Sequence, residues 1–156
     1  MEQRAFDRAG LRASVIGLGT WQLGADWGDI DDRQAEGVLE AAAESGVTFF
    51  DTADVYGDGR SEQTIARFLR DRPDLDILVA TKMGRRVDQI PENYVLDNFR
   101  AWNDRSRRNL GTDRIDRAAG QVETLRRLKR WLGPRVARTV QARSARPYSE
   151  GSVPRT

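Results

Sequence analysis

Residues 49–62 read FFDTADVYGDGRSE, and this stretch decides how the rest of the chain is interpreted. The segment that leads into it, GVTFF at residues 46–50, is short, apolar and rich in β-branched and aromatic side chains, which is typical of a buried strand. Asp51 follows at the C-terminal end of that strand, and Tyr56 stands five residues later in the next loop. In parallel α/β proteins, ligand chemistry collects at this end of the strands. The stretch therefore predicts a site that contains Asp51 and Tyr56.

A second predicted strand adds a cation to the same edge of the sheet. Residues 76–82 read DILVATK, so another apolar run ends on Lys82. A tyrosine hydroxyl has a pKa near 10, and its use as an acid near neutral pH requires that pKa to fall by about three units. A nearby ammonium group favours the phenolate, and Asp51 can pair with Lys82 and hold it in position. One such residue alone would be a turn or capping residue; the three in this order favour a proton-transfer site.

The remainder of the first 116 residues alternates predicted strands and helices. Residues 3–6 and 11–14 flank a turn and predict a small hairpin, and residues 15–19 predict the first strand of the main sheet. Helices are expected over residues 31–45, 61–70 and 92–110. Asp31 or Asp32 is expected to cap the first and Ser61 the second, and Gly111 is expected to end the third. This alternation favours the α/β class with a parallel sheet.

Four motifs in this order resemble the N-terminal part of an aldo-keto reductase. They are GLGTW at residues 17–21, FFDTADVYGDGRSE at 49–62, ATKMG at 80–84 and RNLGTDRID at 108–116. The resemblance implies a (β/α)8 TIM barrel. This chain would hold its first three strand-helix units and the start of a fourth strand, preceded by the β-hairpin.

The same resemblance implies NADPH-dependent reduction of an aldehyde or ketone to an alcohol. Tyr56 would be the general acid, and Asp51 and Lys82 would tune it. The cofactor-binding residues would be Gly19, Thr20, Trp21 and Asp51. GLGTWQ does not fit the GxGxxG dinucleotide fingerprint, because Gln22 stands at the last glycine position, so a Rossmann domain is not expected.

Two features depart from the family. The family carries a catalytic histidine in the segment that should follow Asp116, but the chain contains no histidine. A complete barrel needs about 250 residues, whereas this chain has 156. We therefore expect the chain by itself to be inactive, as a truncated form.

The composition changes after residue 116. Residues 1–116 carry 16 Lys and Arg against 22 Asp and Glu, whereas residues 117–156 carry 10 against 2. The basic part therefore alone explains the pI of about 9.4, and nucleic-acid binding by the acidic part is not expected. We interpret residues 1–116 as barrel and 117–156 as a basic tail outside the family pattern. It has three explanations: a frameshift, an internal deletion, or a genuine appendage.

A genuine appendage would have a predicted structure and a function of its own. Residues 122–132 place Val122, Leu125, Leu128 and Leu132 on one stripe of a helix, and disorder is expected from residue 138 onward. Such a basic helix could bind an acidic partner, RNA or an anionic membrane. This non-catalytic binding role is the alternative to a reductase.

The composition also limits the kinds of site and the cellular location that are expected. Without cysteine or histidine the chain forms no disulfides, and no metal site is predicted. No apolar run reaches the roughly 20 residues of a membrane span, and the start MEQRAFDRAG lacks an export signal, so a cytoplasmic protein is expected. A partial barrel would leave sheet edges unpaired, which favours self-association.

Overall fold

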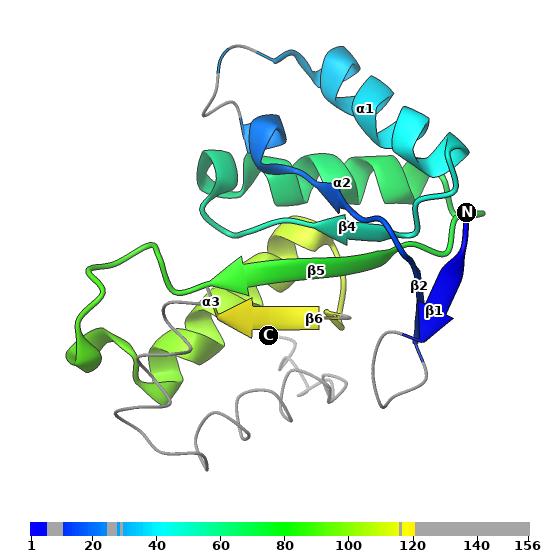
Figure 1. Cartoon of the computed structure of the whole chain (residues 1–156). Coiled ribbons are helices and arrows are strands. Elements are labelled where there is room, and N and C mark those ends of the chain that lie inside the picture. Colours follow the sequence, from blue (N-terminus) through cyan, green and yellow to red (C-terminus); the bar gives the residue numbers. More distant parts are fainter. Residues whose placement is uncertain (6–10, 25–27, 29, 116, 121–156) are drawn as a thin grey trace, which may run out of the picture.

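A four-stranded parallel sheet forms the centre of the computed structural model, which describes residues 1–5, 11–24, 28, 30–115 and 117–120. The strands lie in chain order across the sheet, with β3 and β6 at the two edges (Figure 1). Their bounds are β3 Leu18–Gly19, β4 Phe49–Asp51, β5 Leu78–Met83 and β6 Arg117–Gly120. The predicted α/β class and the parallel sheet are confirmed.

The predicted N-terminal hairpin is also confirmed. β1 (Gln3–Ala5) pairs antiparallel with β2 (Arg12–Ser14). The Thr48 amide donates to the Ser14 hydroxyl and the Ser14 amide donates to the Thr48 hydroxyl, both at 2.9 Å. Since Thr48 immediately precedes β4, the hairpin lies at the N-terminal end of the sheet, away from the end where Asp51 stands (Figure 1).

Three α-helices connect the strands. They are α1 Asp32–Glu44, α2 Arg60–Asp71 and α3 Leu96–Leu110. Asp31 caps α1 in a capping box with Gln34, and Gly111 ends α3 in the left-handed conformation. Three short 3-10 helices follow strand ends or precede α3: η1 Trp21–Gly24, η2 Tyr56–Gly59 and η3 Pro91–Asn93.

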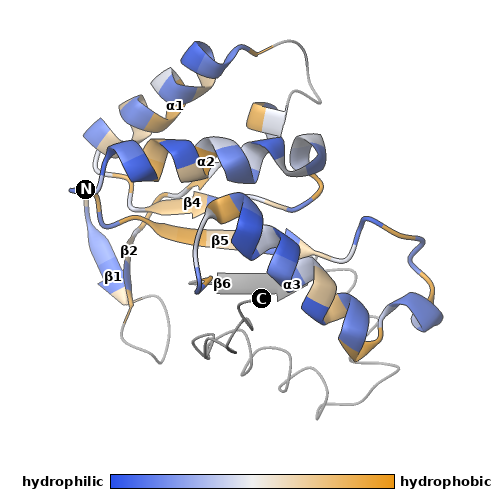
Figure 2. Ribbon diagram, turned by 180° about the vertical axis from the view of Figure 1, so that it is seen from behind, coloured by the Kyte–Doolittle hydropathy of each residue, from blue (hydrophilic) through white to orange (hydrophobic). Residues whose placement is uncertain are grey.

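Helices α2 and α3 cover one face of the sheet, lying behind the strands in Figure 1 and in front of them in Figure 2. Leu39 of α1, Phe50 of β4 and Ile65 of α2 are fully buried in the main apolar cluster. A second cluster joins Met83 of β5 to aromatic residues of α3 and the segment before it: Tyr94, Phe99 and Trp102. These contacts hold the strand ends that carry Asp51 and Lys82.

Several predicted boundaries were wrong. Ser61 does not cap α2: the cap is Gly59, and Ser61 is buried in the first turn. The strand expected from residue 15 begins at Leu18, and the one expected from residue 46 begins at Phe49. The third helix begins at Leu96 rather than residue 92, because Pro91 opens a 3-10 turn and the backbone of Tyr94 and Val95 is not helical.

A fourth strand, β6, pairs with β5 from Arg117 to Gly120. These four residues were assigned to the tail, so the sheet continues past the boundary predicted at residue 116. The remaining tail predictions, for residues 121–156, lie outside the described residues. Within the described part, none of the helices has the length and apolarity that crossing a membrane requires.

Candidate active site

An ion pair joins the ends of two neighbouring strands. Lys82 Nζ lies 2.8 Å from Asp51 Oδ2 and 2.6 Å from the carbonyl oxygen of Thr52. The parallel register places Asp51 of β4 opposite Ala80 of β5, two residues before Lys82. The long Lys82 side chain therefore extends back toward β4 to make both contacts. The Lys82 side chain is only 18% exposed, whereas that of Asp51 is 46% exposed. The ammonium is therefore fixed in direction by two acceptors and shielded from solvent.

Tyr56 lies over this ammonium. It is the first residue of η2, and Lys82 Nζ lies 5.3 Å from the centre of its ring. The Trp21 ring, which is half exposed, stacks on Tyr56 with centroids 6.2 Å apart and planes inclined by 26°. The structure therefore brings together Asp51, Tyr56 and Lys82, together with Trp21 from the predicted cofactor set.

Thr20, unlike the half-exposed Trp21, turns its side chain into the protein interior. Its side chain is fully buried, and its hydroxyl donates to the Asp51 carbonyl oxygen at 3.0 Å. Ser61 Oγ lies 2.9 Å from both the carbonyl oxygen and the hydroxyl of Thr20, and it accepts a hydrogen bond from Thr52 at 3.0 Å. Thr20 thus belongs to a buried hydroxyl network that ties η1 and β4 to α2, and its side chain does not reach solvent.

Gly19 and Asp51 line a hollow of about 500 Å³ on the sheet, together with Phe49 and residues of the hairpin. Side chains alternate along a strand, and Phe50 points into the core that the helices cover. Phe49 and Asp51 therefore point to the other face. A Cβ atom built on Gly19 would meet nothing within 4 Å, so the hollow is open above this glycine.

Two glycines let the loop of Tyr56 approach η1. A Cβ atom on Gly57 would lie 2.2 Å from the Gly24 carbonyl oxygen, and one on Gly24 would lie 2.6 Å from the Gly57 nitrogen. Gly57 also has a positive φ of 57°. Only glycine fits both positions, and the contact holds Tyr56 close to Trp21.

Two buried carboxyl groups beside the site were missed by sequence reasoning. Glu62 is fully buried and accepts hydrogen bonds from Thr81 at 2.7 Å and from Asn109 at 2.8 Å. Asp54 is 1% exposed, and among the described residues neither of its carboxylate oxygens has a hydrogen-bond partner. Burial and the charge of Glu62 raise the pKa of Asp54 to about 6. The pattern DTADVY could have drawn attention to Asp54, but nothing in it indicates burial.

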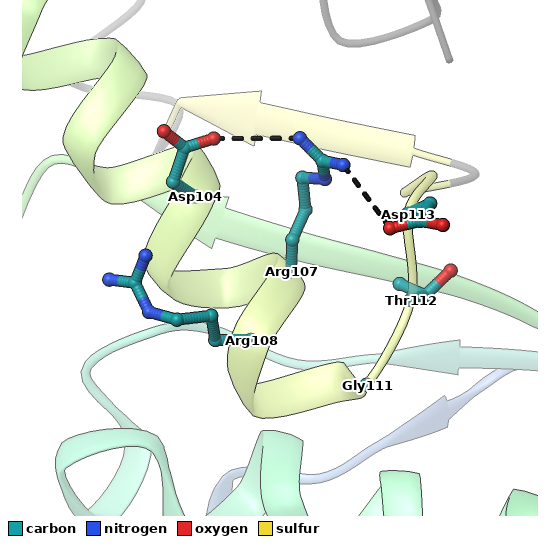
Figure 3. Close-up of a pocket in the computed structure, with 6 residues that line it drawn as sticks. All are labelled: Asp104, Arg107, Arg108, Gly111, Thr112 and Asp113. Carbon is teal, nitrogen blue, oxygen red and sulfur yellow. Dashed lines mark ion pairs between the residues drawn. The ribbon is translucent and has the colours of Figure 1, made fainter. Parts of the chain in front are cut away.

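A second hollow, of about 490 Å³, is lined by residues of the last turns of α3 and of the loop that follows it (Figure 3). It surrounds the end of α3, and Arg107 bridges Asp104 at 3.5 Å and Asp113 at 3.6 Å across it. Within the described residues, no group of three or more acidic side chains could hold a metal ion.

A model of the aldo/keto reductase family matches residues 15–118, which include Trp21, Asp51, Tyr56 and Lys82. The chain belongs to the aldo/keto reductase family. The chain is 39% identical over 84 residues to pyridoxal 4-dehydrogenase of Microbacterium luteolum, covering 54% of the chain and 24% of that relative. It is 33% identical over 130 residues to D-threo-aldose 1-dehydrogenase of a Pseudomonas species, covering 69% of the chain and 40% of that relative.

Solved structures give the same family. The aldo-keto reductase of Bacillus halodurans in its holo form aligns with 83% of the chain and 47% of its own length, with a TM-score of 0.61 and 29% identity. Glycerol dehydrogenase of Gluconobacter oxydans aligns with 83% of the chain and 44% of its own length, with a TM-score of 0.60 and 27% identity. The aldo-keto reductase chain thus spans less than half of each of these relatives. The family match ends two residues beyond the boundary predicted at residue 116.

Proposed function

We propose that residues 1–118 are the proton-donating part of a (β/α)8 barrel that reduces an aldehyde or ketone to an alcohol with NADPH. Tyr56 is the general acid, and Asp51 and Lys82 set its environment. One observation carries this proposal: Lys82 Nζ is held by Asp51 and lies 5.3 Å from the Tyr56 ring centre. An ammonium group at this distance favours negative charge on the tyrosine oxygen that remains after proton transfer.

In this mechanism the Tyr56 hydroxyl hydrogen-bonds to the carbonyl oxygen of the substrate and transfers its proton there. When bound, NADPH supplies a hydride to the carbonyl carbon, which completes the alcohol. Lys82 stabilises the resulting phenolate, and Asp51 prevents the ammonium from turning toward solvent. The hydrogen bond from Lys82 to the Thr52 carbonyl fixes the ammonium from a second direction.

The residues at the C-terminal ends of β3 and β4 fit the nicotinamide end of the cofactor. The hollow above Gly19 is open, Asp51 stands at its border, and the exposed ring of Trp21 offers an aromatic face beside Tyr56. Thr20 would contribute to cofactor binding through its backbone rather than its side chain, since its hydroxyl is engaged with Asp51 and Ser61. Asp51 would serve both the cofactor and Lys82.

The 156-residue chain by itself is proposed to lack turnover. It contains no histidine, so the fourth member of the family's catalytic set has no counterpart in it. Under this proposal, mixing the chain with NADPH and a panel of aldehydes and ketones produces no loss of absorbance at 340 nm. Steady turnover by the purified chain would contradict it.

The role of Tyr56 is best tested in a chimera. Residues 15–118 would replace the corresponding segment of the Bacillus halodurans aldo-keto reductase, and NADPH oxidation would be followed with several carbonyl compounds. Tyr56→Phe is expected to lower kcat by about a thousandfold, which lies within the range typical of general acid catalysis. NADPH binding, measured by quenching of tryptophan fluorescence, is expected to be unchanged.

Tyr94→Phe is the matched control, because the Tyr94 hydroxyl is buried and donates to the Gly84 carbonyl at 2.6 Å, in the segment that leaves β5. Its loss should cost about 1 kcal/mol of stability and leave kcat near the parent value. If the Tyr56→Phe chimera retained full turnover, another residue would be the acid.

A further inference from the structure

The loop that carries Tyr56 has an unusual backbone. Gly57, Asp58 and Gly59 follow one another with φ values of 57°, 54° and 98°. Among the described residues, Asp58 is the single non-glycine residue with a positive φ. Aspartate tolerates this region better than most residues, but at some cost. The loop is therefore not held by the intrinsic preferences of its own backbone.

Two arginines from other elements hold Asp58. Arg105 of α3 donates to the Asp58 carboxylate at 2.9 Å and to its carbonyl oxygen at 2.8 Å. Arg86, in the segment that leaves β5, makes a close ion pair with the same carboxylate oxygen. The Asp58 side chain is nevertheless 74% exposed, whereas those of Arg86 and Arg105 are 22% and 31% exposed. Both guanidinium groups lower the pKa of Asp58, so its carboxylate is ionised near neutral pH.

The same arginines connect this loop to the strand that carries Lys82. Arg86 stands four residues beyond Lys82 and also donates to the Asp54 carbonyl oxygen at 3.1 Å, at the start of the loop. The Asp54 amide in turn donates to the Lys82 carbonyl at 3.0 Å. The loop is thus attached at both ends, at Asp54 and at Asp58, to the segment that follows the catalytic lysine.

We propose that Asp58, Arg86 and Arg105 form a positioning cluster that sets the distance and direction of Tyr56 relative to Lys82. The catalytic purpose of this cluster rests on the proposed function of Tyr56. Its effect on the conformation of the loop does not depend on that function. Asp58, Arg86 and Arg105 are positioning residues and touch neither Tyr56 nor the proposed substrate. Gly57 against Gly24 holds one side of the loop, and the cluster holds the other.

A merely stabilising ion pair would behave differently. Exposed ion pairs contribute little to the free energy of unfolding, so loss of the Asp58 carboxylate should leave global unfolding almost unchanged. The effect of a positioning cluster is local. It should appear in the three backbone hydrogen bonds of this segment, which the amides of Asp54, Tyr56 and Asp58 donate.

Amide hydrogen exchange of the complete 156-residue chain tests this directly. In Asp58→Asn, the peptide covering residues 52–60 is expected to exchange about tenfold faster, because two charge-assisted contacts are lost. Asparagine also tolerates positive φ, so backbone strain is not altered. Peptides from α1 and α2 should exchange at the wild-type rate.

Asp74→Asn is the matched control: Asp74 is similarly exposed, its pKa is also lowered by an arginine, and it lies between α2 and β5 at the far end of the sheet. It should leave residues 52–60 unchanged. Arg105→Gln should reproduce the Asp58→Asn effect, and the double variant should be no faster than the single variants. Unchanged exchange in Asp58→Asn, or an equal increase throughout the chain, would overturn the cluster.

In the chimera, Asp58→Asn should lower kcat about tenfold with little change in KM, since it displaces the acid rather than a binding group. The two proposals fail separately. If Tyr56→Phe retained turnover, the proposed function would be wrong while the exchange result stood. If residues 52–60 kept the wild-type exchange rate in Asp58→Asn while Tyr56→Phe lost turnover, only the positioning cluster would be wrong.

Discussion

Asp54 is a buried carboxyl group that the proposed chemistry does not use. Its backbone bonds to Lys82 and Arg86, but its carboxylate oxygens have no hydrogen-bond partner among the described residues. Burial and the charges of Glu62 and Asp58 raise its pKa to about 6, although Arg86 and Arg105 oppose the rise. Ionisation of this group therefore costs free energy in the folded state.

Replacement of Asp54 by asparagine should reveal that cost as a function of pH. The folded pKa of about 6 lies above the ordinary aspartate pKa of 3.8, so the native state binds more protons in this window and wild-type stability falls as pH rises from about 4 to about 6. Above pH 6 the cost is complete. Asp54→Asn should then stabilise the chain by about 3 kcal/mol, and the difference should vanish near pH 4. Urea unfolding at several pH values measures this; a constant difference across the range would contradict it.

The same residues show how far sequence reasoning reaches at a site. Asp51, Tyr56 and Lys82 were predicted to lie together, and they do, because strand periodicity and the parallel order bring them to one edge. The inward turn of the Thr20 side chain could not be predicted, since its direction depends on Ser61, 41 residues away in sequence. Burial of Asp54 likewise arises from packing by α3 and the segment after β5.

At the level of the elements, the start of α2 is where prediction and structure differ most. Serine before an apolar run is a common helix cap, and this suggested Ser61. In the structure Gly59 takes the cap position with a φ of 98°, and Ser61 points inward to Thr20 and Thr52. The helix therefore begins with a side chain that joins it to the strand ends beneath the site.

Loss of this hydroxyl should cost more than loss of an ordinary helix serine. Ser61→Ala leaves the buried Thr52 hydroxyl without its acceptor and removes one of the two donors to the Thr20 carbonyl, which keeps the Leu23 amide, so we expect a loss of about 2 kcal/mol in the free energy of unfolding. Ser45→Ala, at the exposed end of α1, removes a bond to the Ala41 carbonyl and should cost less than about 0.5 kcal/mol. Denaturant unfolding of both variants measures the difference, and equal losses would show that the network is not stabilising.

The sequence pattern located the three α-helices and strands β3, β4 and β5, but their ends depend on interactions that periodicity does not contain. A cap at Asp31 or Asp32, which the structure places at Asp31, and termination at Gly111 were predicted, since both follow from local chemistry. The late start of β3 was not predicted: Val15 and Ile16 are apolar, yet they are exposed and do not pair with β4. Where a strand begins because of its pairing with a neighbouring strand, the local sequence pattern cannot predict that boundary.

For the molecule as a whole, the two faces of the sheet differ. One is covered by α2 and α3 (Figure 2), and the other carries the hollow that Gly17, Gly19, Phe49 and Asp51 line. Beside this hollow, Ile16 is 60% exposed and Val15 is 46% exposed, next to the edge strand β3. Unpaired edges with exposed apolar side chains favour association with another chain.

The 156-residue chain should therefore associate with itself in solution. We expect sedimentation velocity to show dimers or larger species whose fraction rises with protein concentration, and Ile16→Lys to reduce that fraction, because a lysine at a sheet edge opposes strand pairing. Val87→Lys is the matched control: Val87 is 38% exposed in the segment after β5, at the other end of the sheet, and its replacement should not change the association. A wild-type chain that stays monomeric at every concentration would contradict association through this edge. Equal effects of the two substitutions would instead assign it to net charge, since each adds one positive charge to the same chain.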